Sequence, residues 1–440
     1  MKRIPLYIID VLFLGTLLGV TLGLWYLSPA RLPERLIVVT APYEATTGLL
    51  APFGVGFERE LLEKFWQGAS GGVSASVPIE WRTAVSRDEA LELLRAGQAH
   101  VAVGFGALND ALPTSRTGDL SVGPAYYHAR TVPASLPSLE KSDGASPAAS
   151  MHFLDARSWS VWEPFVDNLA GSDAATDEAS PQEAFRWFWD SRNPVLDQHM
   201  QAFWAQLLDP EDTVLEQLEE RYYGYLPNSV DPYAVLDFLG IVRKRLPRYS
   251  QVIAQAADRA NIDPLLFTAV IIQESRLNAG TVSHTGVQGI MQLTKETARD
   301  LKVNRLDSTQ ALRGGAQYLR MLWKDLEDQG IEEWDRWFFT LAAFNQGPRR
   351  LEGARQLSRK LGGSGNTWRE LKEVYPLLAK PKYAAMVGQN TCRGNEAVLF
   401  VGKVRWYYHI LRGLVTLGRP EAQNLAPLLG APIAGAALGF

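Results

Sequence analysis

The chain has 440 residues, of which 46% are hydrophobic and 13 are tryptophan, so it can bury the cores of two or three domains. Its formal net charge of −4 argues against nucleic acid as the main partner. The single cysteine, Cys392, excludes an internal disulfide and a cysteine-based metal cluster. The six histidines show no ligand spacing, so we expect no metal and no cofactor.

The N-terminus combines a basic start with an apolar run. Lys2 and Arg3 precede residues 11–27, which are apolar apart from glycine and threonine. This run is long for the core of a signal peptide and slightly short for a spanning helix. Residues 1–30 are therefore expected to be a signal peptide or an N-terminal membrane anchor, with the remainder exported to the periplasm.

Residues 31–228 are expected to form an α/β domain, because strand and helix patterns alternate along them. Strands are predicted at residues 36–39, 79–81 and 100–104, and helices at residues 56–65 and 87–96. Such alternation is typical of a parallel sheet. Residues 183–225 then read as strongly helical, residues 227–232 as a linker, and residues 233–246 as a helix leading into a second domain.

The stretch Leu94–Ala102, followed by Arg116 and Gly123–Tyr127, resembles the extracellular solute-binding domains of the amino-acid-binding kind. The resemblance implies that Arg116 clamps the carboxylate of a small ligand or muropeptide, although an ordinary surface position in a loop is the alternative. Residues 129–182, where such domains carry a second lobe, are rich in alanine, serine and proline. That lobe is expected to be short or eroded.

A carboxylate ends an apolar helix in the second domain. Asp263 and Pro264 are predicted to begin the helix as N-cap and first helical residue. Val270, Ile271 and Glu274 then lie on one face of it. Desolvation at the edge of an apolar face favours a neutral carboxyl, which suits a general acid. The alternative is an ordinary surface glutamate.

A glycine-rich loop follows this helix. It contains Gly286 and Gly289, the pair Met291–Gln292, and Thr294 as the predicted N-cap of a helix over residues 295–301. His284 is the histidine of this loop, and we interpret it as a loop residue or a sugar contact. Further on, Phe344–Gly347 forms a second short motif.

Together these motifs resemble the catalytic domain of the soluble-lytic-transglycosylase type, which cleaves peptidoglycan glycan strands. The resemblance implies Glu274 as acid and then base, with the muramic acid 6-hydroxyl as nucleophile and help from the neighbouring N-acetyl group. It accounts for the lack of another acidic residue before Glu296, since most glycosidases use two carboxylates. The residues that it places at the substrate are Ser275, Gly289, Met291, Gln292, Phe344, Asn345 and Tyr383. Taken singly, Met291 and Phe344 could be core residues, and Asn345 could cap a helix.

Two departures from the family pattern follow. Phe400 stands where the family often has a tyrosine, so Tyr383 or Tyr407 would have to supply the missing phenol. Residues 387–392 also differ from the family's usual segment before Arg393. These departures support the alternative hypothesis of a binding or scaffold protein whose catalytic domain no longer cleaves a substrate.

The sequence therefore predicts an α/β periplasmic-binding-protein-like domain followed by a mainly α lysozyme-like domain at residues 229–415. Residues 416–440 form a tail for which disorder is the simplest expectation. Two-domain membrane-bound lytic transglycosylases share this arrangement. A hydrolytic muramidase and a sensor or peptidoglycan-binding protein remain alternatives, and peptidoglycan and a membrane are the expected partners.

Overall fold

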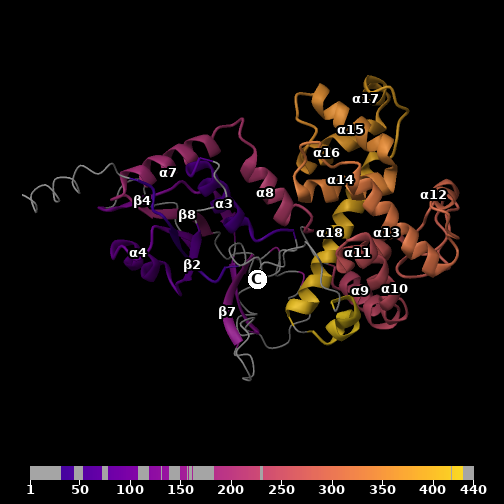
Figure 1. Ribbon diagram of the computed structural model, residues 1–440, viewed down its shortest axis with the longest axis horizontal. Coiled ribbons are helices and arrows are strands. Elements are labelled where there is room, and N and C mark those ends of the chain that lie inside the picture. The colour runs from indigo at the N-terminus through magenta and orange to yellow at the C-terminus, as the bar shows by residue number, and fades with distance from the viewer. Residues whose placement is uncertain are drawn as a thin grey trace, which may run out of the picture.

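The computed structural model describes most of the chain, in segments. These are residues 31–43, 53–71, 78–107, 118–129, 131–137, 149–155, 157, 161, 183–227, 231–417 and 419–429. The expected N-terminal signal or anchor and the ligand candidate Arg116 lie outside these residues, as does most of the expected second lobe. Figure 1 shows an α/β part in indigo and magenta beside a helical part in orange and yellow.

The α/β part is built on one mixed sheet. Its strands follow the order β2-β1-β3-β8-β4, and β5 also pairs with β8. β1 is parallel to both β2 and β3, whereas β8 runs antiparallel to β3, β4 and β5. The elements are β1 Leu36–Thr40, α3 Phe57–Ala69, β2 Ile79–Thr83, α4 Arg87–Arg95, β3 Val101–Ala107, β4 Leu120–Val122, β5 Tyr127–Ala129, β6 Thr131–Pro137, β7 Ala149–Asp155, β8 Glu183–Asp190, α7 Pro194–Leu207 and α8 Val214–Tyr223. β6 and β7 pair as a separate antiparallel hairpin.

The strands and helices expected between residues 36 and 104 are confirmed, but two predictions for this part are wrong. The sheet is mixed instead of wholly parallel, and residues 183–190 form the central strand β8 instead of the start of a helix. All but the first residue of β8 are buried, so the strand lacks the apolar–polar alternation that marks a half-exposed strand. Its aromatic side chains pack on both faces of the sheet.

The helical part holds the second hydrophobic core. Its elements are α9 Pro232–Lys244, η2 Leu246–Arg248, α10 Ser250–Ala260, α11 Pro264–Ser275, α12 Lys295–Asp300, α13 Ser308–Lys324, α14 Glu333–Gln346, α15 Pro348–Lys360, α16 Trp368–Val374, η3 Tyr375–Ala379, α17 Pro381–Met386, α18 Gly394–Thr416, η4 Pro420–Leu425 and α19 Ala426–Leu429. The long helix α18 packs along α11 and α14. None of the helices in the described part of the chain is both long enough and apolar enough to cross a membrane.

The predicted start of the tail belongs to this core. Residues 420–429 form η4 and α19, and the side chains of Leu425 and Leu428 are fully buried. η4 contacts α9 and α18, and α19 contacts α10 and α11. The helical part therefore extends past residue 415, because an apolar segment that looked featureless in sequence finds a hydrophobic surface to cover.

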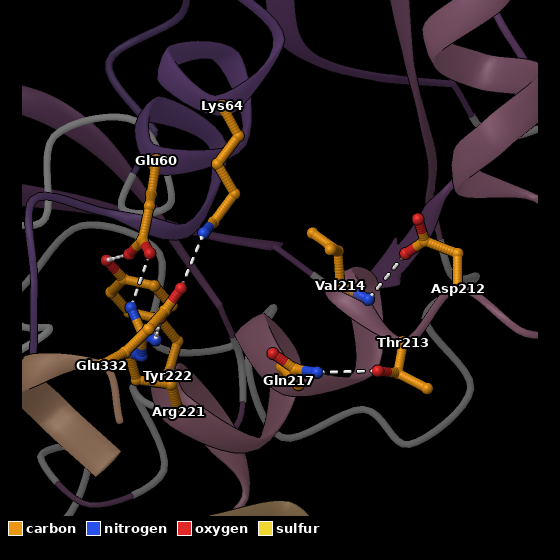
Figure 2. Close-up of polar contacts among 9 residues, drawn as sticks. All are labelled: Glu60, Lys64, Asp212, Thr213, Val214, Gln217, Arg221, Tyr222 and Glu332. Atoms are coloured by element: carbon orange, nitrogen blue, oxygen red, sulfur yellow. Dashed lines mark hydrogen bonds and ion pairs between the residues drawn. The ribbon is translucent and has the colours of Figure 1, made fainter. Parts of the chain in front are cut away.

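The two parts are joined by buried contacts. Phe53, which precedes α3, packs edge-on against Tyr225 and Phe338 in the core of the helical part. Figure 2 shows a cluster of ion pairs in which Arg221 of α8 contacts Glu60 of α3 and Glu332 at the start of α14. Because Arg221 is only 6% exposed, its charge is compensated by carboxylates from both parts.

Candidate active site

The helix that carries the proposed acid is fixed at its start. The Asp263 carboxylate accepts hydrogen bonds from the backbone amides of Leu265 and Leu266, at 2.7 and 3.1 Å, and from the Tyr408 hydroxyl at 2.6 Å. Pro264 occupies the first helical position, as predicted. Residues 264–272 are buried around the whole helix, so α11 is held firmly with its last turn at the surface of the core.

Glu274 lies in that last turn. Its side chain is partly exposed, and burial of its carboxyl raises the pKa to about 8. In the part of the chain that the structure describes, this carboxyl has no hydrogen bond and no ion pair. The backbone turns sharply just beyond it, because Arg276 and Leu277 both adopt positive φ. A pKa of about 8 keeps the Glu274 carboxyl mainly in its protonated form at neutral pH, and none of the described residues pairs with it.

The glycine-rich loop packs beside the end of α11 and holds its own shape. The Gln292 side-chain amide donates to the carbonyls of Gly289 and Thr281, at 2.7 and 3.1 Å. Gly289 has φ +102°, and a Cβ atom there would lie 2.3 Å from the backbone oxygen of Arg305. Glycine is required at this position for both reasons. Thr294 caps α12, as predicted.

Two of the expected substrate contacts are buried. The Ser275 hydroxyl donates to the Ile271 carbonyl at 3.3 Å and makes no bond to Glu274. Met291 is 0% exposed and packs on Gly315 of α13, where a Cβ atom would lie 2.5 Å from the methionine methyl group. Both side chains pack inside the protein, next to the acid and its loop. For Met291 this is the core position that the sequence left open as the alternative.

An aromatic row lies on the neighbouring helices. Phe344 of α14 stacks on Phe400 of α18, with ring centroids 6.5 Å apart, and contacts Tyr318 of α13 at 5.7 Å. Phe400 is buried, whereas Phe344 and Tyr318 are partly exposed. Sequence reasoning missed Tyr318. The feature of the sequence that could have indicated Tyr318 is its position one helical turn after Gly315, the glycine that makes room for Met291.

The end of α14 excludes the alternative that Asn345 is the C-cap of the helix. The helix ends at Gly347, which has φ +86°, so Asn345 lies in the last turn and is not the cap. The Gln346 side-chain amide donates to the Asn345 side-chain oxygen at 2.9 Å. Asn345 stays partly exposed next to Phe344, and its amide nitrogen is available to a ligand.

Neither of the alternative tyrosines, Tyr383 and Tyr407, has a hydrogen bond to Glu274 among the described residues. Tyr407 stacks on Phe238 of α9, with ring centroids 5.0 Å apart. Tyr383 of α17 packs against the core, with Lys382 5.5 Å from its ring, and no contact in the described region joins it to Glu274. His284 contacts Arg393 at 2.6 Å, which links the loop to the start of α18. Within the described residues, no group of three or more histidine, cysteine or acidic side chains could hold a metal ion.

Comparison with known proteins supports the resemblance. Residues 251–365 match the family model described as the transglycosylase SLT domain. The membrane-bound lytic murein transglycosylase F of Alcanivorax borkumensis is 38% identical over 201 residues, which cover 46% of this chain and 43% of the relative. That of Marinobacter nauticus is 36% identical over 212 residues, covering 48% and 42%.

These matches confirm the lytic-transglycosylase resemblance that was predicted from the motifs. The chain nevertheless spans less than half the length of the curated relatives that it matches. Among solved structures, the BvgS VFT2 domain of Bordetella pertussis is 14% identical and covers 43% of this chain and 93% of that domain. Its TM-score is 0.26.

Proposed function

We propose that this protein is a lytic transglycosylase that cleaves the glycan strands of peptidoglycan. The observation that carries the proposal is Glu274, a partly exposed residue within the segment that matches the transglycosylase SLT domain. Its carboxyl has a raised pKa and no partner among the residues that the structure describes. A carboxyl that is protonated at neutral pH can donate its proton to a leaving oxygen. No cofactor is needed for this chemistry.

In the proposed reaction, the Glu274 proton moves to the oxygen that links MurNAc to GlcNAc, and the bond from that oxygen to the anomeric carbon breaks. The N-acetyl group of the muramic acid residue shares the positive charge that develops on its ring. The carboxylate of Glu274 then takes the proton of the 6-hydroxyl as its oxygen bonds to the anomeric carbon. The product is 1,6-anhydro-MurNAc, no water is consumed, and the acid is restored.

The neighbouring side chains fit this role. Phe344 and Tyr318 present partly exposed aromatic faces on which a sugar ring can stack, and Asn345 presents an amide that can bond an N-acetyl group. Ser275, Gly289, Met291 and Gln292 fix the end of α11 and the loop. Their contribution is to the position of Glu274, since binding geometry controls the rate of such reactions.

We assign residues 31–228 to the α/β domain and the helical residues from 229 to 429 to the lytic domain. Relatives of the lytic domain are named membrane-bound, so we propose a periplasmic, membrane-associated location with residues 1–30 as signal or anchor. A small ligand held by Arg116 remains a prediction from the sequence.

The test is product analysis of purified peptidoglycan digested by residues 30–440, beside the Glu274→Gln variant. Mass spectrometry separates an anhydro product from a hydrolysed one by the mass of one water. Anhydro-muropeptides that disappear with the variant are expected. Reducing-end sugars would identify a hydrolytic muramidase, and no product from either protein would favour a binding or scaffold role.

A further inference from the structure

An open cavity of about 530 Å³ lies between the two domains, and Glu274 is not among the residues that line it. Its walls come from α8 of the α/β domain, from α16 and α18 of the lytic domain, and from Arg157. The lining residues are Arg157, Glu216, Glu219, Glu220, Gly224, Arg369, Lys372, Glu373 and Val398. None of them belongs to α11, to the loop after it, or to the aromatic row. The volume falls within the range of small-molecule sites.

The inner wall of this cavity is rigid without an occupant. The Glu220 carboxylate accepts from Lys372 and from Arg405, both at 2.8 Å, and Lys372 also donates to the Gly224 carbonyl at 2.9 Å. Arg405 is 1% exposed. These charges belong to opposite domains and satisfy one another, so the wall is already organised when a ligand arrives.

Arg157 is fixed in a similar way on the side of the cavity. Its guanidinium pairs with Glu219 at 3.2 Å and lies 4.5 Å from the ring of Tyr223. Aromatic stacking and an ion pair together hold a guanidinium in one orientation. This side of the cavity is therefore also formed before binding.

The charged residues that line the cavity and form no ion pair within the described residues include both an arginine and glutamates. Arg369 of α16 is partly buried, and in the described part of the chain it has no ion pair and no hydrogen bond. Glu216 of α8 and Glu373 of α16 are exposed at the cavity and have no pairing partner there. A partly desolvated guanidinium gains from a carboxylate that can accept two parallel bonds, and the free carboxylates gain from an ammonium group.

We propose that this interdomain cavity binds a zwitterion, an amino acid or short peptide with a free amino group and a free carboxylate. The ligand carboxylate contacts Arg369, and its ammonium group contacts Glu216 or Glu373. A purely anionic ligand would pair with Arg369 but would lie beside the negative charges of Glu216 and Glu373. A purely cationic ligand would pair with the glutamates but would lie beside the positive charge of Arg369. Because the walls come from both domains, an occupant stabilises the contact between them. The inference does not depend on the proposed glycan cleavage.

The test measures binding by the Glu274→Gln protein of residues 30–440, so that turnover plays no part. The probe is the tripeptide alanyl-glutamyl-lysine, titrated by calorimetry beside its N-acetylated form, its C-terminal amide and the free amino acids. The intact tripeptide is expected to bind and to raise the melting temperature of the protein. Free amino acids that bind equally well would identify them as the source of the ligand. Each end-blocked form is expected to bind at least tenfold more weakly.

Two added substitutions locate the site. Arg369→Gln is expected to weaken binding of the intact tripeptide at least tenfold while leaving the C-terminal amide unaffected. Arg259→Gln, at an exposed arginine of α10 in the same domain, is the matched control and is expected to change neither. Circular dichroism checks that both variants fold. The proposal is overturned if none of the zwitterions binds, if blocked and free forms bind alike, or if a folded Arg369→Gln protein binds as the parent does.

Discussion

Among the residues that the structure describes, Glu58 in the α/β domain and Glu274 in the helical domain both have a pKa raised far above the usual range, and they differ in their partners. Glu58 of α3 is fully buried in the α/β domain, and burial raises its pKa to about 7. Its carboxylate accepts from Trp187 at 2.6 Å, from the Gly104 amide at 3.1 Å, and from the Tyr126 hydroxyl. Glu274 has a pKa raised to about 8 and accepts from no group in the described residues.

The comparison shows that a raised pKa does not by itself identify a catalytic acid. Three donors hold Glu58 in place and no solvent reaches it, so its proton has no external acceptor. Glu274 is a partly exposed residue in the last turn of its helix, and no described group donates a hydrogen bond to its carboxyl. Structural polar networks can shift a pKa as much as a functional site does. The exposure of the residue and its hydrogen-bond partners distinguish Glu274 from Glu58.

The largest effect is expected from the matched pair of glutamine substitutions. Glu274→Gln should lower the rate of anhydro-muropeptide release by about 10²-fold to 10⁴-fold, because general acid catalysis contributes that much. Glu58→Gln should leave the rate within about threefold, provided that circular dichroism shows a folded protein. A strong loss of rate with Glu58→Gln in a folded protein would break the comparison.

The pH profile should separate the two carboxyls next. In the proposed reaction Glu274 acts first as an acid, so its reactive form is the protonated one, which predominates below the pKa of about 8. We expect kcat/KM to fall about tenfold for each pH unit above that value, because kcat/KM reports the pKa values of the free enzyme. The Glu58→Gln protein should show the same fall in rate above pH 8. A profile that is flat to pH 10 would contradict Glu274 as the acid.

Stability should respond in the opposite direction to activity at Glu274. Its folded-state pKa of about 8 lies above the model value of 4.5, so folding is penalised as pH rises from 4.5 to 8. Glutamine removes that penalty, which is about 1.4 kcal/mol for each pKa unit. We expect the Glu274→Gln protein to melt above the wild type at pH 8, with the difference vanishing below pH 4.5.

Glu58→Gln should show a smaller gain in the same experiment, although the sign of its penalty is the same. A glutamine has one acceptor oxygen where the carboxylate has two, and it adds an amide donor among the three existing donors. Differential scanning calorimetry across this pH range measures both variants. An equal gain for both would show that the donors around Glu58 contribute nothing specific.

The smallest effect is expected from Tyr126→Phe. Loss of the hydroxyl removes one hydrogen bond to Glu58, which should raise the pKa of that carboxyl further. It should also destabilise the α/β domain by about 1–3 kcal/mol. Tyr233→Phe, at a tyrosine of α9 that is 80% exposed, is the control and should change stability little. Glycan cleavage at a temperature where both proteins are folded should be unaffected.

The sequence alone determined the local construction of the candidate site. Asp263 and Pro264 specify the start of α11, Thr294 specifies the cap of α12, and an almost wholly apolar run places Glu274 at the helix end. These are short-range effects in which a side chain satisfies the backbone a few residues away, so the pattern of residue types is enough to predict them.

Tertiary structure decided what local patterns do not contain. β8 is a strand because its aromatic residues are buried on both faces of a sheet, and residues 420–429 are helical because a core offers them a surface. Ser275 and Met291 are buried, and Met291 packs on Gly315 of α13.

The same holds for the features on which function depends. Whether Glu58 or Glu274 has donors is set by segments as distant as Tyr126 and Trp187, and the cavity around Arg369 exists only where two domains meet. Burial and partner choice depend on contacts between residues far apart in the chain, and these contacts are properties of the packed molecule.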